Sequence, residues 1–213
     1  MGDEPVPVLY RDDHLVIVDK PAGVLVVAAP GRRGATLVDL LRRQLELDVR
    51  PVHRLDEETT GAMVFAVDDA GRIGMEQLLR RHDVERVYLA LCSAAPNPPA
   101  GRIESRLREE GGIVRVVPRG GERAVTHYET LGRRGRCTLV RCRLETGRRN
   151  QIRAHLAALG CPIAGDRKYG YRRREGESFP HTMLHSFRLV FVHPVTGIRI
   201  DVEATPAEIE MHP

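Results

Sequence analysis

Apolar and polar residues alternate through much of the chain, with the repeat of two that is typical of β-strands. Several apolar runs end at glycine, proline or aspartate, which favour turns. The first run divides into two strands at residues 11–13, and the last forms a hairpin around residues 194–197. These patterns predict strands within the ranges 6–27, 61–68, 85–94, 103–144 and 186–204.

Apolar residues at helical spacing occur in three shorter stretches, which predict helices over 36–47, 72–82 and 148–160. Thr36 is suited to cap the first helix, and Gly160 is suited to end the third. Strands predominate, and few connections show the strand–helix–strand rhythm of a parallel sheet. We therefore predict a single α+β domain over residues 1–213, with a mixed, largely antiparallel sheet and flanking helices.

The composition of the chain is that of an ordinary globular protein. It has 213 residues, of which 42% are hydrophobic and 29% are charged. No apolar run approaches the roughly 20 residues that a membrane helix needs, and the N-terminus lacks the apolar region of a secretory signal. We expect a cytoplasmic protein without a membrane partner.

Four cysteines stand at Cys92, Cys137, Cys142 and Cys161. The C-x4-C spacing of Cys137 and Cys142 falls on a strand-like run, and no second close pair completes a zinc site. We expect reduced, mostly buried thiols and no metal site.

The net charge is +4, and only two of the 33 basic residues, Lys20 and Lys168, are lysines. This charge is consistent with a polyanionic partner, although genomic base composition also explains a preference for arginine. Short clusters resemble phosphate contacts, but any one of them is more often a solvated surface. The clusters are Arg133, Arg134 and Arg136; Arg148 and Arg149; and Arg172, Arg173 and Arg174.

The stretch "HRLDEETTG" places Asp56 just before a turn that leads into a buried strand. A carboxylate at that position can serve as a nucleophile or a general base. Aspartate, threonine and glycine are also common turn residues, and on spacing alone a turn cap is the stronger interpretation.

A second polar stretch, "TGRRNQIRAHL", spans residues 146–156. Arg149 and Arg153 are four residues apart, so on a helix they share a face that suits a carboxylate or a phosphate. The alternative is a solvated basic face. A third stretch, "PIAGDRKYG", is a turn that carries little signal by itself.

Taken in order, five stretches resemble the RluA-type family of RNA pseudouridine synthases. They are "LYRDDHLVIVDKPAGVLV", "HRLDEETTGAMVFA", "RVYLAL", "ETGRRNQIRAHLAALGCPIAGDRKYG" and "LHSFRLVFVHPVTG". The resemblance runs from about Leu9 to Gly197. It leaves no room for a separate N-terminal RNA-binding module, so we expect one catalytic domain.

The resemblance implies that a uridine in ribosomal or transfer RNA is isomerised to pseudouridine without a cofactor. Asp56 matches the catalytic aspartate, which attacks the ribose or the base. Tyr88 matches a tyrosine that lies against the target base, and Arg153 matches an arginine that pairs with the aspartate. Arg54 matches a residue that fills the gap left by the flipped nucleotide. We expect a monomer whose partner is RNA.

The RNA-contacting set implied by the same motifs is Arg54, His53, Arg148, Arg149, Gln151 and Lys168. The chain departs from the family pattern at Glu57, where a negative charge would repel phosphate, and at Arg149 and Asn150. Glu57 and Glu58 are assigned to the turn surface rather than to chemistry.

Four residues near these motifs are assigned other roles. Lys20 is interpreted as an exposed turn lysine or an RNA contact. His155 is interpreted as a packing residue, and Asp166 and Tyr169 are interpreted as braces of the active-site wall.

Two other functions compete with this one. A homologue that binds or chaperones RNA without catalysis would lack the set of Asp56, Tyr88 and Arg153. A glycoside or nucleoside hydrolase would use two carboxylates across the substrate, and it would release a free base. Glu57 and Glu58 adjoin Asp56 in the sequence, but this adjacency does not by itself place two carboxylates on opposite sides of a substrate.

Overall fold

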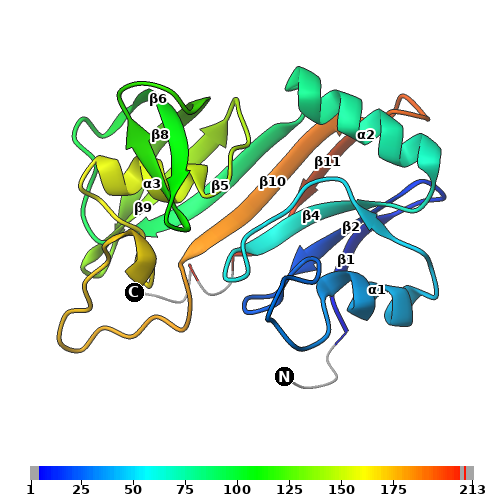
Figure 1. Ribbon diagram of the computed structural model, residues 1–213, viewed down its shortest axis with the longest axis horizontal. Coiled ribbons are helices and arrows are strands. Elements are labelled where there is room, and N and C mark those ends of the chain that lie inside the picture. The colour runs from blue at the N-terminus through cyan, green and yellow to red at the C-terminus, as the bar shows by residue number, and fades with distance from the viewer. Residues whose placement is uncertain (1–4, 207–208, 210–213) are drawn as a thin grey trace. The chain divides into compact units, whose positions relative to one another are not determined.

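The computed structural model describes residues 5–206 and 209. The chain divides into two compact units (Figure 1). Unit 1 contains residues up to Glu85 together with Ser186–Thr205, and unit 2 contains Arg86–His185 and the described residues after Thr205. Unit 1 is therefore built from two segments that are distant in the sequence. No helix in the described part of the chain is long and apolar enough to cross a membrane.

Unit 1 is a sheet with two helices, and four of its strands, β1, β2, β4 and β10, are neighbours in that order with β1 at the edge (Figure 1). β11 pairs with β10, and β3 pairs with β4. Its strands are β1 (Val8–Arg11), β2 (Leu15–Lys20), β3 (Arg50–Pro51), β4 (Thr60–Ala66), β10 (Leu184–Val192, from Ser186 onward) and β11 (Arg199–Glu203). Its helices are α1 (Leu37–Leu45) and α2 (Asp69–Arg81).

The core of unit 1 explains why these strands form. β2 pairs with β4 in antiparallel register, so Leu15 lies opposite Ala66 and Ile17 lies opposite Val64. Alternate residues of a strand point to opposite faces, and these four share one face with Met75 of α2. The other face of β2 and β4 is also buried, which accounts for their nearly continuous apolar runs.

Local capping fixes where the helices of unit 1 begin. Thr36 caps α1 through a reciprocal pair of hydrogen bonds with Asp39, as the sequence predicted. The Asp68 carboxylate accepts a hydrogen bond from the backbone N–H of Gly71, so α2 begins at Asp69, before the predicted start at residue 72.

Unit 2 is a five-stranded sheet in the order β5, β9, β8, β6 and β7. Each neighbouring pair within it is antiparallel. Its strands are β5 (Glu85–Cys92, from Arg86 onward), β6 (Ala100–Glu110), β7 (Ile113–Val117), β8 (Glu122–Arg134) and β9 (Cys137–Leu144). Its helices are α3 (Gln151–Ala158) and the short 3-10 helix η1 (Arg167–Tyr169).

A small apolar cluster joins these helices to the sheet of unit 2. Ala154 of α3 and Tyr169 of η1 pack with Leu107, Val114 and Ala124 from β6, β7 and β8. This packing fixes α3 on the sheet, and with it the positions of the polar side chains that α3 carries.

The α+β prediction is confirmed, with every strand pair whose register is described being antiparallel. All three predicted helices and the final hairpin are present. The stretch 103–144 holds longer strands than its glycine turns suggested, since β8 alone has 13 residues. The prediction of a single catalytic domain without a further RNA-binding module stays a prediction.

One glycine of unit 1 allows a close approach between two backbones. Gly61 lies in β4 with φ of +104°, and a Cβ atom there would stand 2.3 Å from the backbone oxygen of Ser186 in β10. The Ser186 hydroxyl also donates a hydrogen bond to the Ala62 carbonyl. Only glycine tolerates both the dihedral angle and the contact.

Gly61→Ala should therefore lower the free energy of unfolding by about 2–4 kcal/mol, because the methyl group forces two paired backbones apart. Gly112→Ala is the matched control. Gly112 also has a positive φ, +78°, but nothing lies within 4 Å of its Cβ position, so its cost should be about 1 kcal/mol. Urea denaturation of both variants measures the difference, and equal costs would contradict the close-approach argument.

Candidate functional site

Asp56 lies in the turn of unit 1 that connects β3 to β4. Leu55 and Thr59 on either side are buried, while Asp56 itself is half-buried. The backbone N–H of Thr59 donates to the carbonyl of Asp56 over 3.1 Å, which closes the turn. The buried side chains of Leu55 and Thr59 thus anchor a short polar turn in which Asp56 is half-buried.

A buried lysine holds this turn in place. Lys20 ends β2 and is fully buried. Its ammonium donates to the carbonyls of Pro21 and Glu57 over 2.8 Å each and to the carbonyl of Thr59 over 2.9 Å. An ammonium group has three donors, so these three carbonyls use all of them.

The interpretation of Lys20 as an exposed turn lysine or an RNA contact is therefore wrong. The motif "DKPAG" resembles an exposed turn, but the lysine side chain extends inward to backbone acceptors that lie nearly forty residues away in the sequence. Nothing in the local sequence could reveal those acceptors.

The same lysine influences the electrostatics around Asp56. Burial lowers the pKa of Lys20 to about 8, and the carboxylates of Asp56 and Glu57 oppose that shift. The opposing effect requires both carboxylates to be near the ammonium. Lys20 is thus a fixed cation near the carboxylate of Asp56.

Glu57 is the acidic departure that seemed to disfavour RNA in this turn. Its side chain forms an ion pair with Arg32, and its backbone carbonyl accepts from Gly23 as well as from Lys20. The carboxylate of Glu57 is therefore paired with Arg32, which reduces the repulsion expected for phosphate.

The two residues before Leu55 face different surroundings. The His53 Nε2 atom accepts a hydrogen bond of 3.0 Å from the backbone N–H of Val64, so the ring has its proton on Nδ1 and supports β4. Arg54 is exposed and makes no hydrogen bond or ion pair with another described residue. RNA contact by His53 and Arg54 stays a prediction.

Arg153 lies in α3 of unit 2, where a buried carboxylate holds its guanidinium. Its Nε donates to Oδ2 of Asp166 over 2.7 Å, and its Nη2 donates to Oδ1 over 2.9 Å. The Asp166 side chain is 1% exposed, so this bidentate pair is almost fully desolvated. The guanidinium also lies over the ring of Tyr169, 4.8 Å from its centroid.

Both partners of Arg153 are fixed in turn. Asp166 caps η1 by accepting from the backbone N–H of Tyr169. The Tyr169 hydroxyl accepts from the backbone N–H of Val114 and from Nδ2 of Asn150, over 3.0 Å each. Asp166 and Tyr169 therefore brace Arg153, and their assignment to the wall of the active site stays a prediction.

Tyr88 and His155 are also in unit 2. Tyr88 is 7% exposed in β5, where it pairs in register with Cys142 of β9. His155 is buried between Ser105 and Thr126, each 2.9 Å from one of its ring nitrogens. Burial lowers the pKa of His155 to about 4, so the ring is neutral near pH 7 and acts in packing, as predicted.

The prediction that Gln151 contacts RNA is wrong in this structure, because the side chain is buried and its bonds are made within the protein. Its Oε1 accepts from Thr146 and from the backbone N–H of Arg148, and its Nε2 donates to Val125 and Thr126. These bonds fix the loop before α3 onto β8.

The predicted pairing of Arg149 and Arg153 on one helix face is also wrong, because α3 begins only at Gln151. Arg149 is exposed and binds both oxygens of Glu109, while Arg148 forms an ion pair with Glu122. Contact with RNA by Arg148, Arg149 and the exposed Lys168 stays a prediction.

The predicted catalytic residues are distributed over the two units, with Asp56 in unit 1 and Tyr88 and Arg153 in unit 2. All four cysteines belong to unit 2 and are free and buried. Among residues 5–206 and 209, no group of three or more histidines, cysteines or carboxylates could hold a metal ion.

Comparison with known proteins gives a consistent result. Residues 14–158 match the family described as RNA pseudouridylate synthase. A ribosomal large subunit pseudouridine synthase D from Xanthomonas campestris is 36% identical over 233 residues, which cover 97% of this chain and 67% of that protein. The protein of the same name from Zymomonas mobilis is 32% identical over 221 residues, covering 95% of this chain and 69% of that protein.

Solved structures agree with the sequence comparison. The structure of human RNA pseudouridylate synthase domain containing 4 has a TM-score of 0.73 and 26% identity, covering 93% of this chain and 88% of that one. The structure of human RNA pseudouridylate synthase domain containing 1 has a TM-score of 0.80 and 24% identity, covering 96% of this chain and 85% of that one. At this identity the similarity supports the fold alone.

Lys20→Met should lower the free energy of unfolding by about 2–4 kcal/mol at pH 7, because it leaves the three carbonyls of the Asp56 turn without their donor. Circular dichroism during urea denaturation measures this loss. Lys168→Met is the matched control, since Lys168 is exposed, and its cost should be within about 0.5 kcal/mol of zero.

The same pair gives a pH test. The pKa of Lys20 falls from 10.5 to about 8 on folding, so between these pH values the folded state binds fewer protons than the unfolded state. The stability of the parent should therefore rise, relative to Lys20→Met, as the pH increases from 8 to 10.5. If the difference in unfolding free energy between the parent and Lys20→Met did not change over that pH range, burial would not disfavour the protonated form of Lys20.

Proposed function

Since the chain belongs to the RNA pseudouridylate synthase family, we propose that it isomerises a uridine of a structured RNA with Asp56 as the nucleophile. The observation that carries the assignment is the Lys20-held turn, which fixes Asp56 beside a buried cation. A nucleophilic carboxylate must be ionised when the substrate displaces water, and a nearby cation preserves that charge.

The reaction conserves atoms and needs no oxidant or reductant. The N1–C1′ glycosidic bond of uridine breaks, the base rotates, and a C5–C1′ bond forms. One hydrogen leaves C5, and N1 gains one. The carboxylate of Asp56 forms the transient covalent bond, either with C1′ of the ribose or with the base, and it leaves again when the product is released.

Tyr88 and Arg153 are proposed to serve the same reaction from unit 2. The Tyr88 ring would lie against the target base, where stacking contributes roughly 1–3 kcal/mol, and its hydroxyl could transfer the proton. Arg153 is proposed as the arginine that the family motif assigns to the catalytic aspartate. Its geometry suits this purpose, since Asp166 and Tyr169 hold the guanidinium and limit its motion.

Base flipping explains the exposed arginine next to the nucleophile. A uridine stacked within a stem cannot reach a half-buried carboxylate, and extrusion costs a few kcal/mol. We assign Arg54 to fill the gap that the extruded nucleotide leaves. Support comes from its exposure and from its place two residues before Asp56.

The names of the relatives favour one class of RNA. The Xanthomonas and Zymomonas proteins are both named for the large ribosomal subunit, so we propose large-subunit ribosomal RNA as the first substrate to test and transfer RNA as the second. A pseudouridine map of cellular RNA with and without the gene identifies the modified uridine.

Asp56→Asn tests the nucleophile. Asparagine keeps the shape of the side chain but cannot carry the negative charge, so the variant should fold, bind a transcript containing the mapped uridine with near-parental affinity, and form no detectable pseudouridine. The measurements are pseudouridine formation and filter binding. Isomerisation at the parental rate would remove Asp56 from this role.

Glu58→Gln is the matched control, because Glu58 is an exposed carboxylate in the same turn. It should keep most of the activity. A parent protein that forms no pseudouridine on any cellular RNA would overturn the proposed reaction and leave RNA binding as the function.

Arg153→Lys tests the guanidinium without removing its charge. Lysine lacks the planar fork that binds both oxygens of Asp166, so kcat should fall by at least about tenfold while RNA affinity stays within about twofold. Removal of the charge with leucine is less informative, since it leaves Asp166 buried and unpaired and is expected to destabilise the fold by about 3–5 kcal/mol.

Arg188→Lys provides the comparison. Arg188 also pairs with a carboxylate in a bidentate manner, to Asp201, but it lies on the β10–β11 hairpin of unit 1. Rates are compared per folded molecule at a temperature where every variant is folded. If Arg153→Lys and Arg188→Lys both keep the parental kcat, Arg153 has only a structural role.

A further inference from the structure

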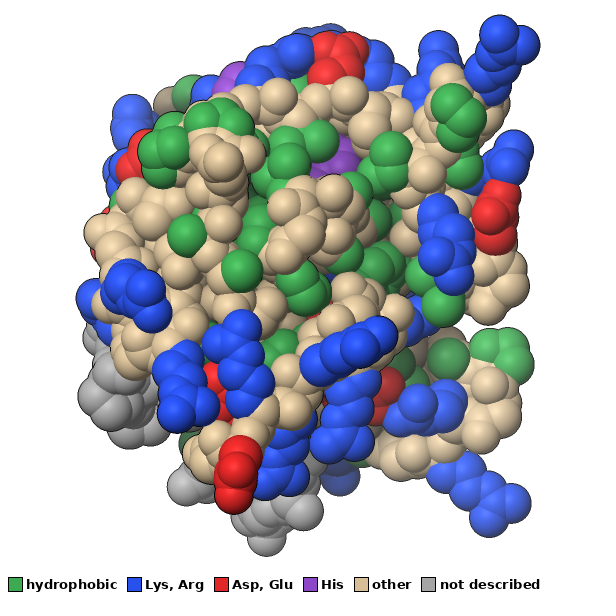
Figure 2. All heavy atoms as spheres, turned by 90° about the vertical axis from the view of Figure 1, so that its left-hand side faces the viewer, with side chains coloured by type: hydrophobic (Ala, Val, Ile, Leu, Met, Phe, Trp, Pro, Cys, Tyr) green, Lys and Arg blue, Asp and Glu red, His purple; other side chains and the backbone are tan. Residues whose placement is uncertain are grey.

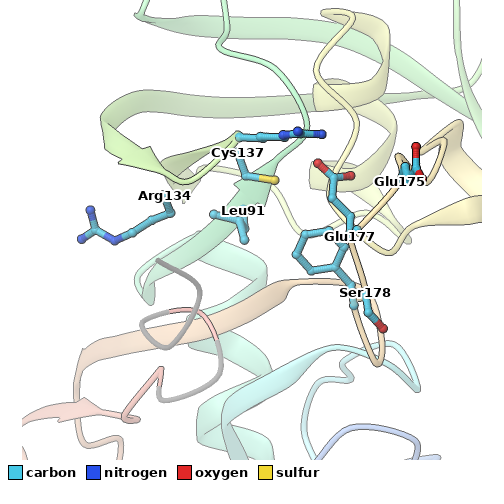
Figure 3. A pocket seen from close by; sticks show the side chains of 9 residues that line it. Leu91, Arg134, Cys137, Glu175, Glu177 and Ser178 are labelled. Atoms are coloured by element: carbon cyan, nitrogen blue, oxygen red, sulfur yellow. The ribbon is translucent and has the colours of Figure 1, made fainter.

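A cavity of about 460 Å³ opens on unit 2, in a place that the proposed reaction does not use (Figure 3). Leu91 of β5 and Cys137 of β9 contribute to it from the sheet, and Arg134 comes from the end of β8. The other side is the segment 175–179, which lies between η1 and β10. Its volume falls within the range of small-ligand sites.

The sheet side of the cavity is apolar and chemically inert. Leu91 is fully buried, and burial together with nearby Glu177 raises the pKa of the Cys137 thiol. The thiol therefore stays protonated and is a poor nucleophile. Phe179 adds an aromatic ring, which packs edge-on against Tyr171 with centroids 5.7 Å apart. Such a surface suits binding of a flat apolar group rather than covalent chemistry.

Glu177 supplies a fixed acceptor in this apolar setting, and its carboxylate lies close to Cys137 in Figure 3. Its Oε2 accepts from the Tyr171 hydroxyl over 2.9 Å and from the backbone N–H of Arg174 over 3.3 Å. Its Oε1 is buried and has no hydrogen-bond partner among the described residues, with Arg174 Nη1 at 3.9 Å. A buried carboxylate oxygen in this state requires a donor.

The exposed charged residues of the cavity lining are two arginines, Arg134 and Arg136, and one carboxylate, Glu175. Arg134 donates to the backbone carbonyl of Arg133, and neither Arg134 nor Arg136 forms an ion pair with a carboxylate in the described part of the chain. Arg141, on the same pair of strands, is by contrast paired with Glu129. Figure 2 shows basic side chains outnumbering acidic ones on the lower part of the face that it displays. Guanidinium groups without carboxylate partners are suited to phosphate.

An aromatic and apolar surface, a single buried acceptor and an arginine rim together match the parts of a nucleotide. We propose that this cavity binds one nucleotide whose base carries an exocyclic amino group, with Glu177 accepting from that group and Arg134 and Arg136 binding its phosphate. The proposal rests on the proposed function only in taking RNA as one source of the nucleotide. A free nucleotide is the other source.

The acceptor also predicts which base is rejected. Cytosine, adenine and guanine each present an amino group as a donor at the base edge. Uracil has only a ring N–H there, and it stands between two carbonyl oxygens that a carboxylate repels. The cavity should therefore discriminate against uridine, the base that the catalytic residues act on.

Isothermal titration with CMP, AMP, GMP, UMP and inorganic phosphate tests the site. The parent should bind CMP at least about fivefold more tightly than UMP, since a hydrogen bond to a charged group is worth about 1 kcal/mol more than one to a neutral group. Glu177→Gln keeps an oxygen for the Tyr171 hydroxyl but loses the charge. It should weaken CMP by about fivefold and leave UMP unchanged.

Matched controls separate this effect from general loss of charge. Glu129→Gln removes a carboxylate that already has an arginine partner, and CMP binding should not change. Arg134→Gln combined with Arg136→Gln should weaken all four nucleotides by a similar factor, whereas Arg141→Gln should not. Equal CMP binding by the parent and Glu177→Gln overturns the proposal, as does inorganic phosphate binding as tightly as CMP.

Addition of substrate RNA identifies the source. If the RNA displaces labelled CMP from the parent, but does not displace the CMP that still binds to the Glu177→Gln variant, the cavity holds a nucleotide of the RNA. If pseudouridine forms while CMP stays bound, the cavity holds a free nucleotide. Both results support the site. The two proposals can fail separately. If Glu177→Gln binds CMP more weakly but the parent makes no pseudouridine, the proposed function is refuted and the proposed nucleotide site is supported.

Discussion

A single buried ammonium group organises the part of unit 1 that contains the nucleophile. The side chain of Lys20 is removed from water, and the cost of that removal is offset by three backbone carbonyls and by the two carboxylates nearby. The turn containing Asp56 has no regular secondary structure to hold it, so these bonds replace the ladder of a sheet. Any change that disturbs Lys20 affects both the shape of the turn and the charge beside Asp56.

Unit 2 fixes its own charged group by a different method. Arg153 is held from two sides, by the carboxylate of Asp166 and by the ring of Tyr169, and each of these is held by a further hydrogen bond. A guanidinium held in this way loses little entropy when a substrate approaches. Both units thus place a cation by buried hydrogen bonds rather than by exposed ion pairs, which are weak and screened by salt.

Local features were predictable from the sequence, and long-range contacts were not. The helix that begins after Thr36 and the buried strand after Asp56 follow from capping and periodicity. The motifs also indicated the family, and with it the residues proposed for catalysis. Lys20 and Gln151 were misinterpreted because their hydrogen-bond partners lie in other elements. The sequence of a motif does not show whether a polar side chain faces solvent or the core. The cavity at Glu177 gave no signal either, since its walls come from three separate segments.

The discontinuity of unit 1 affects the order in which the chain can fold. Residues 86–185 form one contiguous segment, so all strands of unit 2 are available once that segment has left the ribosome. The core of unit 1 instead includes Leu189, Phe191 and Ile200, which are synthesised more than a hundred residues after β4. Until they arrive, β4 lacks its neighbour β10 and exposes an apolar edge that is prone to misassociation. Closure of such a long loop is slow, so completion of the Asp56-bearing unit is expected to be the late step of biosynthesis, and the segment 86–185 of unit 2 serves as an early folding nucleus.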